Sequence, residues 1–180
     1  MTDRQTEILD STKIYAKKLS DKMKSIKYAN MIENKLAEKI SEVGDYYHDF
    51  EAFDKYGERL KFSTLTDKYI LLDFTSAFCG ACRRTIPELK SIDKTYSDSL
   101  KIVSFWVLTP PEKWLKSLEQ DSITWLSLWD GDRKGNSTQI NYGVTAFPTF
   151  FLIDPKGIII DKWLGYSEGL IKEKLKRFSR

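Results

Sequence analysis

Residues 69–82, with the sequence YILLDFTSAFCGAC, carry the strongest structural signal in the chain. Its first part, Tyr69–Thr75, is a short and nearly continuous apolar run, which is typical of a strand buried on both faces. The residues from Cys79 to about position 97 then follow a helical pattern, with Pro87 inside it. Two cysteines three positions apart, Cys79 and Cys82, therefore fall where a buried strand passes into a helix.

The segments on either side of this stretch alternate between strand and helix patterns. Strands that alternate with helices and end in a hairpin indicate an α/β fold with a mixed central sheet. The further predicted strands are Phe50–Phe53, Leu60–Leu65, Lys101–Leu108, Trp125–Trp129, Thr149–Ile153 and Ile158–Trp163. Turns are predicted at Asp54–Gly57 and Asp154–Gly157. Three further helices are predicted, one that begins at Pro110, one over Asn136–Tyr142 and one over Ser167–Phe178.

The first 44 residues differ from everything that follows. Residues 4–43 contain neither glycine nor proline, and their apolar side chains recur mostly at steps of three, four or seven, which is a helical period. We expect a helical arm or linker over residues 1–44 that ends at Gly44, followed by one domain over residues 45–180. A packing appendage is the favoured interpretation of the arm, and a surface for self-association or partner binding is the alternative.

Composition excludes several classes of protein. A chain of 180 residues with 41% hydrophobic content can build a real core. No apolar run approaches the roughly 18 residues of a membrane span, and the first thirty residues are too polar for a signal-peptide core. The 29 basic and 26 acidic residues are scattered, so no basic stripe predicts nucleic-acid binding. With two cysteines and the single His48, a zinc site would need a second subunit.

The cysteine pair points to redox chemistry. Cys79 sits at the predicted helix start, where free backbone N–H groups and the helix dipole favour a negative charge, so it is the expected nucleophile. Cys82 lies one turn inside the helix and is the expected resolving thiol. Two structural thiols are the alternative, less favoured because a helix N-terminus activates a thiol.

From about Phe50 to Phe178 the chain resembles the thioredoxin fold, and most closely the TlpA/ResA-like thiol–disulfide oxidoreductases, which are grouped with the alkyl hydroperoxide reductase and thiol-specific antioxidant proteins. The motifs that carry the resemblance occur in the family's order. They are the strand Tyr69–Phe74, Cys79–Gly–Ala–Cys82, Pro87 five residues later, Tyr142–Gly–Val, and Phe147–Pro148–Thr149 leading into Phe150–Gly157.

The resemblance implies site roles at four further positions. Pro148 would be a cis-proline facing the disulfide, leaving the backbone of Phe147 free to pair with an extended substrate. Phe78, where the family usually has tryptophan, is the third expected substrate contact. Asp73 matches the family's buried acid, which would have a raised pKa and exchange a proton with Cys82. The alternative for Asp73 is a solvated residue that ends its strand or caps a neighbour.

Some positions depart from the family pattern. Thr75 replaces an aromatic residue, Gly-Ala replaces Gly-Pro between the cysteines, and Thr85 stands where many members carry glutamate. These changes leave thiol exchange intact and leave the redox potential and the substrate open. Trp114, Trp125 and Trp129 are expected to be packing residues and not a ligand cage.

The expected function is that of an enzyme which reduces disulfides in client proteins and receives electrons from an upstream dithiol donor, without a cofactor or metal. A disulfide oxidase or isomerase using the same residues and a non-catalytic binding module are the alternatives. A peroxidase is disfavoured, because Leu72 and Ser76 stand where peroxiredoxins carry proline and threonine. The resemblance alone favours the periplasm or cell envelope, with the cytoplasm as the alternative, and the polar arm is compatible with a chain cut from a longer precursor.

Overall fold

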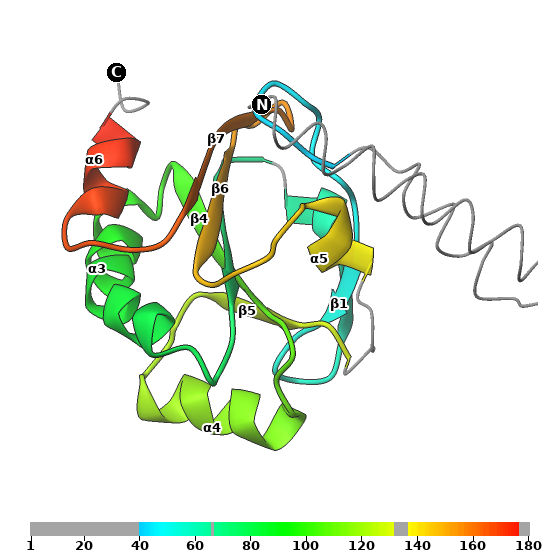
Figure 1. The fold of residues 1–180 in the computed structure, drawn as a ribbon, viewed down its shortest axis with the longest axis vertical. Coiled ribbons are helices and arrows are strands. Elements are labelled where there is room, and N and C mark those ends of the chain that lie inside the picture. The colour runs from blue at the N-terminus through cyan, green and yellow to red at the C-terminus, as the bar shows by residue number, and fades with distance from the viewer. Residues whose placement is uncertain (1–39, 66, 132–136, 177–180) are drawn as a thin grey trace, which may run out of the picture. The chain divides into compact units, whose positions relative to one another are not determined.

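The computed structural model describes residues 40–65, 67–131 and 137–176 (Figure 1). Nearly all of them belong to a compact unit that runs from Ser41 to Arg180. Of the helical arm predicted for residues 1–44, only residues 40–44 are described, and they form a turn and irregular backbone where a helical end was expected. The remainder of the arm lies outside the described residues. The arm and the domain boundary at position 44 therefore stay predictions.

The strands of the described residues form one mixed sheet in the order β2-β1-β5-β4-β3-β6-β7. Strands β3, β4 and β5 run parallel, and β6 and β7 continue the sheet antiparallel on the β3 side. The hairpin β1–β2 closes the other side, where β1 pairs antiparallel with β5. This arrangement confirms the α/β prediction with a mixed central sheet. The bounds are β1 Glu51–Phe53, β2 Arg59–Lys61, β3 Tyr69–Thr75, β4 Leu100–Trp106, β5 Leu126–Trp129, β6 Thr149–Ile153 and β7 Ile159–Leu164.

Helices cover both faces of this sheet. Helices α3 and α6 lie on one side of it and α5 on the other (Figure 1). Side chains of α4 join the apolar cluster to which α3 and α6 contribute, so α4 belongs to the same face. The helices are α3 Gly80–Tyr96, α4 Pro111–Gln120, α5 Ser137–Asn141 and α6 Leu170–Lys176.

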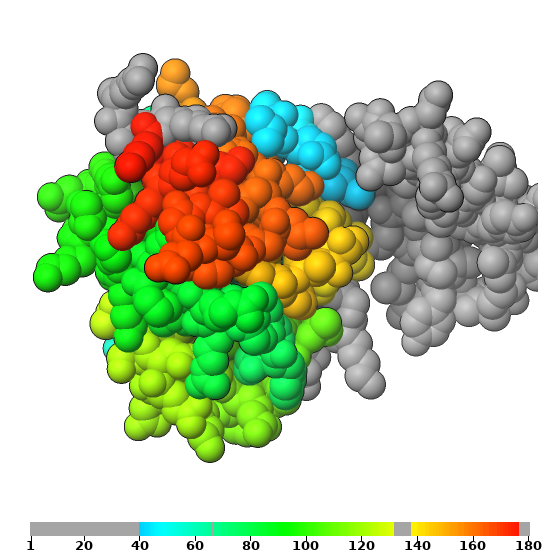
Figure 2. Space-filling view, turned by 60° about the vertical axis from the view of Figure 1, so that its left-hand side comes forward, coloured from blue at the N-terminus to red at the C-terminus, as the bar shows by residue number. Residues whose placement is uncertain are grey.

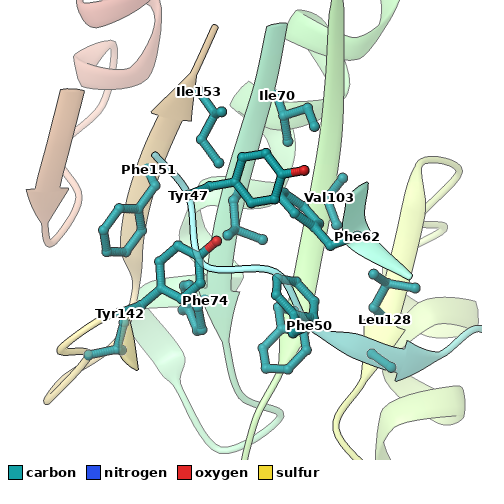
Figure 3. Close-up of a cluster of buried hydrophobic side chains, with 14 of the residues drawn as sticks. Tyr47, Phe50, Phe62, Ile70, Phe74, Val103, Leu128, Tyr142, Phe151 and Ile153 are labelled. Carbon is teal, nitrogen blue, oxygen red and sulfur yellow. The ribbon is translucent and has the colours of Figure 1, made fainter. Parts of the chain in front are cut away.

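Strand β3 is buried on both faces, as its apolar run predicted. Ile70, Leu72 and Phe74 enter a cluster rich in aromatic rings on the α5 side, shown in Figure 3. Leu71, between them in sequence, enters the second cluster beneath α3, α4 and α6. Alternate side chains of a strand point to opposite faces, which explains why this run shows no polar alternation.

Phe74 lies among the rings of the aromatic cluster. Its ring centroid is 5.3 Å from that of Phe105, 5.2 Å from Tyr142 and 5.7 Å from Phe151. The hydroxyl of Tyr142 donates to the backbone oxygen of His48 at 2.8 Å, so this polar atom is satisfied at the edge of the cluster. Packed rings of this kind hold the sheet to the segment that precedes β1.

Helix α6 is tied to α3 by a buried carboxylate. Glu88 of α3 accepts hydrogen bonds from the backbone N–H of Gly169 at 3.0 Å and of Lys172 at 2.8 Å. Gly169 directly precedes α6 and Lys172 lies in its first turn, where backbone N–H groups have no partner within the helix. Figure 2 shows α6 in red lying against α3 in green on this face of the molecule.

The sequence prediction for Leu60–Leu65 was wrong in its second half. The strand ends at Lys61, and Phe62–Leu65 form a 3-10 helix. Phe62 is fully buried and stacks on Phe50 with 4.6 Å between ring centroids, so the chain must turn inward there. The backbone N–H of Ser63 then donates to the Asp49 side chain at 2.9 Å, which holds the turn.

Both predicted hairpin turns are present and have the same construction. In each turn the first aspartate side chain accepts two hydrogen bonds from backbone N–H groups, all at 2.9 Å. Asp54 accepts from Tyr56 and Glu58. Asp154 accepts from residues 156 and 158. Such local side-chain bonds are the reason that aspartate followed by glycine predicts a turn.

We predict that Phe74→Ala lowers the free energy of unfolding by about 3–5 kcal/mol, because it removes a ring from a filled cluster. Phe78→Ala is the matched control. Phe78 is 69% exposed, so the same substitution four residues later should change stability by no more than about 0.5 kcal/mol. Urea denaturation measures both variants. Equal losses would mean that the aromatic cluster does not stabilise the fold as its packing indicates.

Candidate active site

The two cysteines lie at the point where β3 passes into α3. Cys79 is the N-cap residue of α3, and its Sγ accepts a hydrogen bond from the backbone N–H of Cys82 at 3.0 Å. The two residues are joined by a disulfide, with their Cα atoms 5.2 Å apart. Cys79 is half-buried and Cys82 is only 3% exposed. An incoming partner would therefore meet Cys79 first, which fits the roles that the sequence predicts.

Thr109, which sequence reasoning missed, holds the loop before Cys79. Its hydroxyl lies 3.2 Å from that of Ser76 and accepts from the backbone N–H of Ala77 at 3.1 Å. The carboxyl ends of the parallel strands β3 and β4 meet at the same edge of the sheet, so Thr109 can reach across from its own loop. A threonine just after a predicted parallel strand was the available signal.

The Phe147–Pro148 peptide bond is cis, as the resemblance implied. Thr149, the next residue, pairs with Phe74 near the carboxyl end of β3. The topology therefore brings Phe147 and Pro148 to the edge of the sheet that carries the cysteines. Pro148 is buried and Phe147 is half-buried against the aromatic cluster. Their part in substrate binding stays a prediction.

Two large apolar side chains are exposed on the loops at this edge. Phe78, directly before Cys79, is 69% exposed, and Leu108, two residues after β4, is 62% exposed. Leu108 has a φ of 51°, a left-handed conformation that is uncommon for a residue other than glycine. Sequence reasoning named Phe78 and missed Leu108, because a leucine that continues an apolar strand pattern gives no sign of leaving the core.

Asp73 lies in the middle of β3 and is 3% exposed, so the alternative of a solvated strand end is wrong. It shares a face of the sheet with Leu71, on the side covered by α3. Ser104 Oγ donates to Asp73 Oδ2 at 3.1 Å, and Oδ1 has no hydrogen-bond partner in the described part of the chain. Burial raises the pKa of the Asp73 carboxyl to about 7, and the bond from Ser104 opposes that shift.

Comparison with known proteins identifies the fold family. A family model for thioredoxin-like proteins matches residues 67–159, which is more than half of the chain. The chain belongs to the thioredoxin-like family. The match covers β3, both cysteines, Asp73 and the Phe147–Pro148 segment.

Named relatives of this thioredoxin-like protein come from Bacillus subtilis. The thioredoxin-like protein YneN is 29% identical over 68% of this chain and 71% of its own length. The thiol-disulfide oxidoreductase ResA is 27% identical over 68% of this chain and 67% of its own. A crystal structure of the thioredoxin domain of a thiol-disulfide oxidoreductase from Bacteroides vulgatus is similar to this chain, with a TM-score of 0.70 and 23% sequence identity. The match covers 78% of this chain and 99% of that one, and it supports the fold.

The described residues contain neither a cluster of metal ligands nor a membrane-spanning helix. Within residues 40–65, 67–131 and 137–176, no three His, Cys, Asp or Glu side chains come together as a metal site requires. None of the helices in those ranges combines the length and apolar content needed to cross a bilayer. The expectation of an enzyme that needs neither metal nor cofactor stays a prediction.

We predict that Asp73 makes the stability of the oxidised protein depend on pH. Its pKa is about 7 in the folded chain against an ordinary value of 3.8, so the folded state binds this proton more tightly than the unfolded state. The stabilisation is complete below pH 3.8 and is lost as the pH rises through 7. Between about pH 4 and 8, the free energy of unfolding of the wild type should fall by about 4 kcal/mol more than that of Asp73→Asn, because the variant has no carboxyl to ionise at this position.

Urea denaturation of both oxidised proteins at several pH values measures this difference. Asparagine keeps an oxygen that can accept from Ser104, so the comparison isolates the charge. Parallel stability curves for the two proteins would contradict a raised pKa at Asp73.

Proposed function

We propose that this protein is a thiol–disulfide oxidoreductase that reduces disulfides in client proteins through Cys79 and Cys82. The observation that carries the proposal is the asymmetry of the pair, with a half-buried Cys79 at the N-terminus of α3 and a buried Cys82 one turn inside. A thioredoxin-like relative named as a thiol-disulfide oxidoreductase supports the same reaction class. The exposed Phe78 beside Cys79 supports a macromolecular client.

In the proposed reaction, reduced Cys79 attacks one sulfur of the client disulfide. The client S–S bond breaks, a mixed disulfide forms between Cys79 and the client, and the client's other sulfur leaves as a thiolate that takes a proton from water. Cys79 suits this step because the N-terminus of α3 stabilises a thiolate.

Cys82 then completes the transfer. It gives up its proton, attacks the Cys79 sulfur and releases the client's second thiolate, so the client gains two electrons and the Cys79–Cys82 disulfide forms. An upstream dithiol donor returns the pair to the reduced state by the same exchange in reverse order.

We assign the proton from Cys82 to Asp73. The carboxyl has a pKa of about 7, close to neutral pH, and lies on the α3 side of the sheet as the buried Cys82 does. A base whose pKa is near the working pH can both accept a proton and give it back. An ordinary carboxylate with a pKa of 3.8 would be a much weaker acceptor for a thiol proton.

Client contacts are assigned to Phe78, Phe147 and Pro148. Phe78 offers an exposed ring next to the nucleophile, and Phe147–Pro148 lies at the same edge of the sheet.

We further place the protein in the periplasm or cell envelope. Residues 1–44 are proposed as an arm for packing or for partner binding.

The reduction potential of the Cys79/Cys82 couple tests the direction of the reaction. We expect a value below about −240 mV, because a reductant of client disulfides must be more reducing than its substrates. Thiol trapping and mass spectrometry across dithiothreitol and glutathione buffers measure it. A value above about −180 mV would mean an oxidase or isomerase, and no intramolecular disulfide at any potential would mean a binding module.

The two cysteine variants test the order of attack. Cys82→Ser should accumulate a mixed disulfide with a protein substrate, because Cys79 can attack and nothing resolves the product. Cys79→Ser is the matched control and should trap far less, since Cys82 is buried. Non-reducing gel electrophoresis compares the two. Equal trapping by both variants would contradict the assignment of Cys79 as nucleophile.

A further inference from the structure

A row of buried polar side chains crosses the three parallel strands at Asp73. Asp73 of β3 pairs with Ser104 of β4, and Ser104 pairs with Ser127 of β5. The three residues are buried, with 2–4% of each exposed. Each serine accepts a hydrogen bond from a tryptophan indole, Ser104 from Trp125 at 2.9 Å and Ser127 from Trp114 at 3.1 Å. Only Ser104 contacts the carboxyl.

The hydrogen bonds that join Trp125, Ser104 and Asp73 all run the same way, with Trp125 donating to Ser104 and Ser104 donating to Asp73. An indole N–H can only donate, so Ser104 Oγ is the acceptor in its bond with Trp125. A serine hydroxyl carries one proton, and Ser104 donates it to Asp73 Oδ2 at 3.1 Å. Oδ2 is thereby occupied, and Oδ1 is the carboxyl oxygen without a partner among the described residues.

We propose that Ser104, oriented by Trp125, is a positioning residue for Asp73: it holds Oδ2, favours the ionised carboxylate and leaves Oδ1 to exchange the proton with Cys82. This inference rests on the proposed function, because it deepens the role of Asp73 in that reaction. A hydrogen bond to a charged group favours the charged form, so Ser104 counteracts part of the effect of burial on the carboxyl.

The charged side chains on the neighbouring elements are engaged elsewhere or exposed. On α3, Glu88 accepts from the backbone of α6, Arg83 pairs with Asp121 at 3.1 Å, and Arg84 is exposed. Strand β6 carries no charged residue, and the only one on β4, Lys101, lies at its start and contacts Asp67. The other charged residues of α3, at positions 90, 93 and 94, lie beyond its first two turns. Within the described chain, Ser104 is therefore the polar group set to tune Asp73.

We expect Ser104→Ala to raise the pKa of Asp73 by about one unit, since a hydrogen bond to a charged group is worth that much or more. Trp125→Phe should shift the pKa in the same direction by less, because the hydroxyl remains but is no longer oriented. Ser104→Thr keeps the hydroxyl and should restore the wild-type value. Ser127→Ala is the matched control: it removes a buried serine with a tryptophan partner from the same row, and should leave the pKa unchanged.

Two measurements on the full chain test the proposal. Carbon-13 NMR of the Asp73 carboxyl, followed across pH 5–9 in the oxidised protein, gives the pKa in each variant without requiring turnover. Stopped-flow measurement of client release from the Cys79 mixed disulfide gives the pH dependence of the step in which Cys82 loses its proton. The acidic limb of this rate against pH should move to higher pH by about one unit in Ser104→Ala and should stay in place in Ser127→Ala.

The outcomes separate this inference from the proposed function. An unchanged Asp73 titration in Ser104→Ala, or an equal shift in Ser127→Ala, would overturn the positioning role even if turnover is normal. A shifted titration in a protein that never exchanges thiols would overturn the proposed function and leave the effect of Ser104 on Asp73 standing. If Ser104→Ala does not fold, the Trp125→Phe variant tests the proposal in its place. An Asp73 pKa in Trp125→Phe equal to that of the wild type would overturn the proposal.

Discussion

Strand β3 forms backbone hydrogen bonds with β4 on one side and β6 on the other, and its side chains fill an apolar cluster on each face. This double burial fixes the strand's register on both sides. The cysteine loop, the Thr109 loop and the Phe147–Pro148 segment consequently meet at one edge. The sheet core therefore supplies the rigidity that a site built on loops lacks.

Within that site, two ionisable groups experience opposite environments. The N-terminus of α3 favours a negative charge on Cys79, and the apolar surroundings of β3 disfavour one on Asp73. In the reaction proposed above, the first environment activates the Cys79 thiol, and the second lets the Asp73 carboxyl carry a proton in either direction. One strand–helix junction of about ten residues provides both conditions.

Local sequence was enough to predict the β3 strand, the α3 helix and the cysteine pair, because each has its signal within a few residues, whereas the cis-proline was implied by the family resemblance. Thr109, Leu108 and the Ser104–Trp125 contacts were not predicted. They depend on which residue of β4 lies opposite which residue of β3 and β5, and that register is set by packing across the sheet. Trp125 was expected to be a packing residue, which its burial confirms, but its indole N–H also has a specific partner.

Glu88 gives the C-terminal helix a part in the integrity of the site. Its two oxygens satisfy the first turn of α6, and its own helix begins directly after Cys79. A chain shortened before Gly169 would lose both of these hydrogen bonds, six residues after Cys82, together with the apolar side chains by which α6 packs against α3. Recombinant versions of this domain should therefore extend through Lys176, and a tag is better placed after α6 than in exchange for it.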